Sequence, residues 1–473
     1  MLLILSLDVA VVLSLSYVAF THSFEGALPL SAFLLIIFPY ESTFSFLGLF
    51  DITTQRVIIL TLIALYFIRR KRQPRATNAP LRYLIAILVA WMSISTLTSI
   101  VFAVSAKSLL STVIDYVSIY FIFVRTIRKQ RTIINIFFAF VCAMFVCSLW
   151  GFFEAYWDWS VISLFPPAVH RFADLVAIND RDARVQSSFG HAILFGSALA
   201  MTIPLTIYLI SLCGKSTLRR AFLLCALALM FLNLYKTSSR GPWIAAIIGL
   251  ALSLLFGNRS MRLGVLLICL SAVTILVTRP GVWTTITNLY RETINPDTAQ
   301  GESYQWRWAL YSIAFERLNN DIGRALVGFG PESFFYLRWH GTFGGRTVIF
   351  ESCDSSIAAL MIETGYVGMI LTVLLPIRAL SLAHKHLTNL RASSDPLPKV
   401  IGISIIVFSF MMTNVLIFGW GQQSFLFWIL LSMIAIYPQL ASDIVNAPRS
   451  QSLMAPARLL PSFTTTHGSL NQA

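Results

Sequence analysis

The sequence predicts an all-α polytopic membrane protein with about twelve transmembrane helices and a large extracytoplasmic loop that contains amphipathic helices. Three observations predict this fold. Of the 473 residues, 57% are apolar and 12% are charged, whereas soluble domains carry about 25% charged residues. The mean hydropathy is +0.75. Apolar segments of about 20 residues, the length that spans a bilayer, recur along the chain, and basic residues fall in the gaps between them.

The apolar segments give the number of helices. The second apolar segment, near residues 28–48, is interrupted by Pro39 and Glu41. It either spans the bilayer or only dips into it, which predicts twelve or thirteen helices. We expect helices near residues 2–20, 28–48, 55–69, 81–103, 108–125, 132–153, 190–212, 220–237, 241–256, 261–278, 355–377, 399–417 and 422–438.

The basic residues predict the orientation. Placing the first basic run in the cytoplasm puts the other runs there too by simple alternation, together with the basic stretch 378–399, as the positive-inside rule requires. The net charge of +14 therefore orients the protein and does not indicate a nucleic acid partner. The runs are RRKRQPR (69–75), RTIRKQR (125–131), KSTLRR (215–220) and NRSMR (258–262).

Two long segments, 154–189 and 279–354, fall outside the cytoplasm by the same alternation. Within the second, SYQWRWALYSIAFERL (303–318) has a helical spacing of aromatic and aliphatic residues, which predicts an amphipathic helix on the membrane surface. We therefore expect a polytopic domain over residues 1–445 in the cell inner membrane. The Pro-, Ser- and Thr-rich residues 446–473 predict a disordered cytoplasmic tail.

The most unusual string is YKTSSRGPWIAA (235–246), which places Arg240 at the outer junction between two apolar helices. Gly241 and Pro242 begin the second helix, and Pro suits a first helical turn. A helix N-terminus beside an arginine attracts anions, although an arginine at a helix end can also simply extend to the membrane interface. The string predicts a diphosphate-binding arginine or such an interfacial charge.

Other polar residues fall on the same predicted side. An acid inside an apolar segment, such as Glu363, is costly unless it is paired or faces a cavity. Most of the others precede predicted helices or lie in the Gly-rich turn GRALVGFGPESFF (323–335). Their convergence predicts a polar site at the outer face, formed by Arg184, His191, Arg240, Arg307, Glu332, Asp354, Ser355 and Glu363.

Three short motifs carry a resemblance to a known family. The chain has T-S-S-R-G at 237–241, G-F-G-x-x-x-F at 328–334 and L-x-x-E-x-G-x-x-G at 360–368. Over residues 180–380 it resembles the O-antigen ligase and polymerase superfamily of Wzy-type proteins. This resemblance implies a multi-spanning glycosyltransferase that takes a glycan from undecaprenyl diphosphate outside the cytoplasm, without nucleotide sugars.

The resemblance also implies roles for single residues. Arg240 matches the arginine of the family's S-R-G string, Arg184 the arginine before the preceding helix, and Arg307 a third arginine in the large loop. Together they would bind the diphosphate. The family's ligases carry a His-Asn pair where this chain has Asp354 and Ser355. This departure favours a polymerase of exopolysaccharide, capsule or O-antigen repeat units.

The charges suggest a mechanism without metal or cofactor. Arginines neutralise the departing lipid diphosphate, and Asp354 accepts the proton of the attacking sugar hydroxyl. His191 and Glu332 are the alternative bases. Asp180 and Asp182 are spaced like a metal-binding pair, but short charged loops produce such spacing by chance, so we expect no metal site.

Two other functions stay open at this point. The first is an O-antigen ligase that transfers polymer from undecaprenyl diphosphate to lipid A core or another acceptor. The second is a small-anion transporter, which predicts broken helices and internal repeats. For a polymerase, the expected partners are the lipid-linked glycan, membrane lipid, a chain-length regulator and a flippase.

Overall fold

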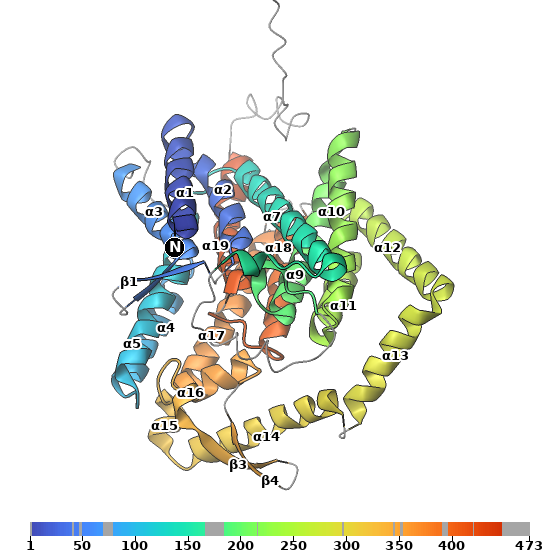
Figure 1. Cartoon of the computed structure of the whole chain (residues 1–473). Helices are drawn as coiled ribbons and strands as arrows, with labels where there is room; N and C mark the ends of the chain where they lie inside the picture. The colour runs from blue at the N-terminus through green and yellow to red at the C-terminus, as the bar shows by residue number, and fades with distance from the viewer. Residues whose placement is uncertain are drawn as a thin grey trace, which may run out of the picture.

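The computed structural model describes residues 2–39, 42–46, 50–69, 79–165, 184–214, 216–295, 298–343, 346–350, 353–389, 396–419 and 421–446. These residues are mostly helical (Figure 1). The helices in the first half are α1 (Leu2–Thr21), α2 (Phe24–Ile37), α3 (Thr54–Arg69), α4 (Arg82–Leu97), α5 (Phe102–Thr112), η2 (Val113–Val117), α6 (Ser118–Thr126), α7 (Gln130–Trp157), η3 (Val161–Leu164), η4 (Ser187–Phe189), α9 (Ala192–Leu212) and α10 (Thr217–Lys236).

The second half continues with α11 (Arg240–Phe256), α12 (Arg259–Thr278), α13 (Pro280–Ile294), α14 (Ala299–Asn319), α15 (Ile322–Val327), α16 (Phe334–Leu337), α17 (Ser356–Asn389), α18 (Leu397–Met412) and α19 (Gly421–Asn446). Two short antiparallel hairpins join them. One pairs β1 (Thr43–Phe46) with β2 (Phe50–Thr53), and the other pairs β3 (Trp339–Phe343) with β4 (Arg346–Phe350).

Outside residues 279–354, most of the helices coincide with the apolar segments of the sequence, although α2 ends at Ile37, before the end of the expected segment 28–48. Within the described residues, eight helical segments are long and apolar enough to cross a membrane, one of them formed by α5, η2 and α6 together. The shorter helices α2, α4, α11 and α18 are apolar as well. The all-α polytopic prediction is therefore confirmed, while the figure of about twelve spans stays a prediction. The two hairpins were not expected.

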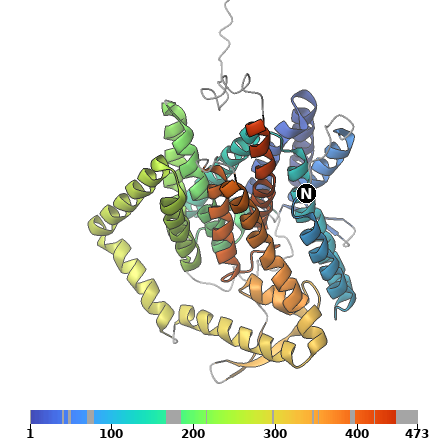
Figure 2. The same cartoon turned by 180° about the vertical axis from the view of Figure 1, so that it is seen from behind.

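The centre of the bundle is formed by α9, α18 and α19. The apolar windows of α9 and α19 are each 89% buried, whereas that of α12 is 11% buried. Phe408 of α18 stacks on Phe427 of α19 with ring centroids 4.2 Å apart. Figures 1 and 2 show α1 to α3 at one edge of the bundle and α12 at the other.

A second, smaller core forms the cap, which we define as α14, α15, α16, β3 and β4. It lies at the end of the molecule opposite the end of α19 (Figures 1 and 2), and α12 and α13 lead down to it along one side. Leu310, Ala314 and Leu318 give α14 a buried face, which packs in the same cluster as Trp339 and Phe350. The sequence therefore predicted the helix but not its environment, because its apolar side packs within the cap.

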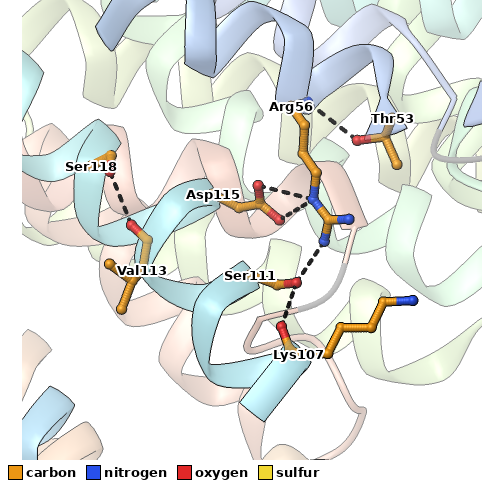
Figure 3. Close-up of polar contacts among 7 residues, drawn as sticks. All are labelled: Thr53, Arg56, Lys107, Ser111, Val113, Asp115 and Ser118. Carbon is orange, nitrogen blue, oxygen red and sulfur yellow. Dashed lines mark hydrogen bonds and ion pairs between the residues drawn. The ribbon is translucent and has the colours of Figure 1, made fainter. Parts of the chain in front are cut away.

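A buried ion pair fixes α3 to the helices that follow it. The Arg56 Nε atom lies 3.1 Å from Asp115 Oδ2, and its Nη2 donates to the Ser111 hydroxyl at 2.8 Å (Figure 3). Asp115 lies in η2, a short π-helix, and such π-bulges occur mostly as local insertions in α-helices. Since removing one partner of a buried pair costs about 3–5 kcal/mol, Arg56 and Asp115 hold this part of the bundle in register.

Candidate functional site

The site begins where α17 is broken into two helices. Gly365 lies in the left-handed region with φ of 70°, which interrupts the helical hydrogen bonds. The carbonyls before the break find new donors, as buried backbone groups must. The backbone N–H of Phe329 donates to Ile362 at 3.0 Å, and that of Gly330 donates to Glu363 at 2.8 Å.

Helix α4 closes the other side of the break. The Ser95 hydroxyl donates to the Glu363 carbonyl at 2.7 Å, and the Trp91 indole donates to the Thr364 carbonyl at 3.0 Å. The Gly-rich turn and the E-x-G string are therefore two halves of one joint, which fastens the cap to α17 and α4. This joint gives the two glycine motifs a structural reason that the sequence alone did not show.

Gly365→Ala should destabilise the protein, because a methyl group there would collide with the Leu326 carbonyl and alanine is strained at positive φ. We expect a loss of more than about 1 kcal/mol, seen as a lower melting temperature of the purified protein. Gly281→Ala is the control, because a methyl group at Gly281 meets nothing within 4 Å. Equal melting temperatures for the two variants would contradict the joint.

The connection between α18 and α19 holds the start of α17. The backbone N–H of Ser356 donates to the Val415 carbonyl at 3.1 Å, and the Ser356 hydroxyl accepts from the N–H groups of Ile417 and Phe418 at 2.7 and 3.0 Å. Ser355 and Ser356 are 2% and 1% exposed. This end of the helix is therefore a rigid, buried platform for Asp354, which lies two residues before the first residue of α17.

The cap docks on this platform through α14. The Arg307 Nε atom lies 3.7 Å from Asp354 Oδ2, with side chains 31% and 38% exposed. One helical turn further, the Tyr311 hydroxyl lies 2.6 Å from the Ser355 hydroxyl. Burial raises the pKa of Tyr311, and its hydrogen bond with Ser355 lowers it by less, so the phenol stays protonated. Spacing of four residues places both contacts on one face of α14.

Arg240 is the first residue of α11 and lies beside α9 and the end of α18. A methyl group at Gly196 of α9 would collide with Pro242, and one at Gly241 would lie 3.4 Å from Met411 Cε. The next residue of α18, Met412, accepts a hydrogen bond from the Ser355 hydroxyl at 3.4 Å. The end of α18 therefore packs between the Arg240 junction and the platform of Asp354.

Arg184 lies in a segment that α7 and α10 hold in place. The Glu154 carboxylate of α7 accepts from the backbone N–H groups of Gln186 and Ser187 at 3.2 and 2.7 Å. The N–H of Val185 donates to the Lys236 carbonyl, at the end of α10, at 3.4 Å. Arg184 is thus placed near the junction that carries Arg240, although the two residues are far apart in the sequence.

His191 caps the start of α9 with its own side chain. Its Nδ1 atom accepts from the backbone N–H of Ile193 at 3.2 Å, so the neutral ring carries its proton on Nε2. Burial lowers the pKa of His191, the Asp354 carboxylate raises it, and Arg184 lowers it again. His191 therefore lies within electrostatic reach of both Asp354 and Arg184, and it is a neutral donor.

Glu363 and Asp354 both interact electrostatically with Cys353. Burial raises the pKa of the Cys353 thiol to about 12, its hydrogen bond with Ser355 lowers it, and the Glu363 and Asp354 carboxylates raise it. Glu332 lies elsewhere, in the turn whose Pro331 carbonyl accepts from the Ser105 hydroxyl of α5 at 2.8 Å. Its backbone is in the left-handed region, with φ of 56°.

The structure thus gathers most of the residues singled out in the sequence. Arg307 contacts Asp354, and His191 interacts electrostatically with both Asp354 and Arg184. Arg240 lies across the end of α18. Asp180 and Asp182 lie outside the described residues. Among the residues that the structure describes, no group of three or more His, Cys, Asp or Glu could hold a metal ion.

Sequence reasoning missed two polar pairs. The Tyr311–Ser355 contact had no signal beyond the four-residue spacing from Arg307. The sequence did contain a signal for the Arg56–Asp115 pair. Asp115 lies inside the apolar segment 108–125, and an acid inside an apolar segment needs a partner.

Comparison with known proteins identifies the part of the chain that contains this site. Residues 225–373 match the Wzy_C family model, described as O-Antigen ligase. The matched region runs from α10 to α17 and contains Arg240, Arg307, Asp354 and Glu363, whereas Arg184 and His191 precede it. No curated protein matches the chain. Residues 225–373, which contain most of the candidate site, are therefore similar to the O-antigen ligase family.

Proposed function

We propose that the protein is a glycosyltransferase that polymerises oligosaccharide repeat units carried on undecaprenyl diphosphate. The product is exopolysaccharide, capsule or O-antigen, made on the outer face of the cell inner membrane. The contact between Arg307 and Asp354 within the matched domain carries this proposal. It brings a guanidinium close to a carboxylate, and the proposed reaction needs a cation for the diphosphate and a base for the acceptor hydroxyl.

The arginines bind the leaving group. Departure of the lipid diphosphate builds negative charge, and guanidinium groups bind phosphate through two parallel hydrogen bonds. Arg184 and Arg240 lie on the α9 and α11 side of the site, and Arg307 approaches from the cap. His191 adds a neutral donor through Nε2, since its Nδ1 is occupied as a helix cap. The structure therefore argues for His191 as a hydrogen-bond donor rather than as the alternative base.

Asp354 acts as the general base. Its carboxylate accepts the proton of the acceptor sugar hydroxyl while that oxygen attacks the anomeric carbon of the donor. The bond from this carbon to the phosphate oxygen breaks, and its electron pair leaves with undecaprenyl diphosphate. A single displacement of this kind inverts the anomeric centre. Each group in this scheme is a side chain of the protein, so we propose a reaction without a metal or cofactor.

The ligase is the second candidate, favoured by the description of the matched family model. The polymerase stays first because Asp354 and Ser355 stand where the ligases have His and Asn. The Ser355 hydroxyl, moreover, is engaged with Tyr311 and serves to position the cap. A transporter with a broken helix would use the freed carbonyls for ions, but here those carbonyls accept hydrogen bonds from the protein at Ile362, Glu363 and Thr364.

A gene deletion separates the two enzymes. Loss of a polymerase should leave glycan one repeat unit long, whereas loss of a ligase should leave long polymer on undecaprenyl diphosphate. Mass analysis of lipid-linked and surface glycans measures both. Long lipid-linked polymer in the deletion strain would replace the polymerase with the ligase. A polymerase would work beside a flippase that supplies repeat units and a regulator of chain length.

The orientation is testable by reporter fusions. Fusions near residues 72, 128 and 217 should report the cytoplasm, because basic runs surround them. Fusions near 170 and 320 should report the outside. The position of the cap at the end of the molecule opposite the end of α19 (Figure 1) supports this arrangement. A cytoplasmic signal at 320 would contradict both the orientation and the proposed site of reaction.

A further inference from the structure

Helix α14 meets the residues at the start of α17 through two polar contacts of different strength. Tyr311 and Ser355 form a short contact of 2.6 Å, and Ser355 is almost fully buried. The Arg307–Asp354 ion pair is long, at 3.7 Å, and about a third of each side chain is exposed. The first contact can therefore hold α14 in place while the second opens and closes.

The backbone of α14 does not need to move for this to happen. Leu310, Ala314 and Leu318 anchor the helix in the core of the cap, and the joint at Gly365 fastens the cap to α17. Arg307 lies one turn before Leu310 on the same face of that anchored helix, and its side chain is 31% exposed, so a change of its side-chain rotamer is enough to move the guanidinium. Arginine has many accessible rotamers, and ordering it in an exposed pair gains little.

We propose that Arg307 is shared between Asp354 and the lipid diphosphate. In the empty enzyme the guanidinium pairs with Asp354 and occupies the carboxylate that serves as base. When the donor binds, the diphosphate takes Arg307, because its oxygens carry more negative charge than one carboxylate. Asp354 is then released to face the acceptor hydroxyl. The base is therefore exposed only while a donor is bound.

This inference rests on the proposed function and adds an order of events to it. The donor must bind before the acceptor is deprotonated, which prevents the carboxylate from engaging an acceptor sugar without a donor. The neighbouring cations make the exchange feasible. His191 interacts electrostatically with both Arg184 and Asp354, so a diphosphate held by Arg184 and Arg307 would lie close to Asp354.

The test measures binding instead of turnover. The probe is undecaprenyl diphosphate without glycan, and its affinity for the purified protein in lipid nanodiscs is measured by equilibrium binding. Asp354→Asn removes the carboxylate that competes for Arg307, so it should tighten binding about two- to five-fold, the range that a part-exposed ion pair supplies. The same change in an Arg307→Gln background should give no such gain.

The double-mutant comparison separates competition from simple repulsion. If Asp354 only repelled the diphosphate, Asp354→Asn would tighten binding equally well or better without Arg307. A gain that survives in the Arg307→Gln background therefore overturns the proposal, as does the absence of any gain in the otherwise native protein. Arg317→Met, an exposed arginine on the same helix, is the control and should leave affinity unchanged.

The outcomes also separate this inference from the proposed function. If the native protein does not bind undecaprenyl diphosphate, both are overturned. If it binds but the coupling between Arg307 and Asp354 is absent, only the shared arginine is overturned. Size-exclusion profiles identical to that of the native protein establish that each variant is folded.

Discussion

Arg240→Ala is expected to abolish polymer while the protein stays inserted and abundant. Arg240 begins α11 at a junction that packs against α9 and α18, and in the proposed reaction its guanidinium neutralises the departing diphosphate. Removing one such donor from an active site typically costs about 10²- to 10³-fold in rate. Gel analysis of surface glycan, normalised to protein level, measures the loss.

The lysine substitution separates the two interpretations of this arginine. Arg240→Lys keeps the charge but cannot make the planar two-point contact with phosphate, so we expect it to lose most activity as well. A charge that merely reaches the membrane interface would tolerate lysine. Arg279→Ala, an exposed arginine before α13, should leave polymer unchanged. Full polymer length from Arg240→Lys would show that the arginine has no specific part in the reaction.

Asp354→Asn is expected to stop chain growth and leave single repeat units on the lipid carrier. The amide keeps the size of the side chain and its hydrogen-bonding capacity but cannot accept the proton. Loss of a general base costs about 10²- to 10⁴-fold in rate. The start of α17 should stay folded, because Ser356 and Val415 hold it through hydrogen bonds that do not involve Asp354. Mass analysis of lipid-linked glycans is the measurement.

The conservative variants complete this test. Asp354→Glu retains the carboxylate, displaced by one methylene, and should keep partial activity. Asp158→Asn changes an exposed acid at the end of α7 in the same way, and asparagine suits the left-handed backbone there. It should have no effect. Polymer of native length from Asp354→Asn, at normal protein level, would exclude Asp354 as the base.

Hydropathy predicted most of the membrane helices because each needs only an apolar run of sufficient length. It could not predict the break in α17, which depends on donors from Trp91, Ser95 and the Gly-rich turn. Trp91 and Ser95 are more than 200 positions away from the break in the sequence, and the Gly-rich turn is about 30 positions away. The sequence showed both glycine motifs, but it did not show that the Gly-rich turn and the E-x-G string contact each other.

The candidate site shows the same division. The prediction that Arg184, Arg240 and Asp354 share the outer face follows from alternating spans, since loops on one side must share a face. The pairing of Arg307 with Asp354 did not follow, because it depends on how the cap folds back onto α17. The aromatic and aliphatic residues that form the small core of the cap follow the same sequence pattern as those of a helix lying on a membrane surface. The sequence therefore does not distinguish the two environments.

A polymerase of the proposed kind joins two lipid-linked glycans and releases undecaprenyl diphosphate. Purified protein in nanodiscs, supplied only with undecaprenyl-diphosphate-linked repeat units, tests this proposal directly. We expect a ladder of longer lipid-linked glycans, with one undecaprenyl diphosphate released for each new glycosidic bond and no requirement for a nucleotide sugar. Repeat units that stay single with Asp354 and Arg240 intact, and are transferred only when a different acceptor is added, would contradict it.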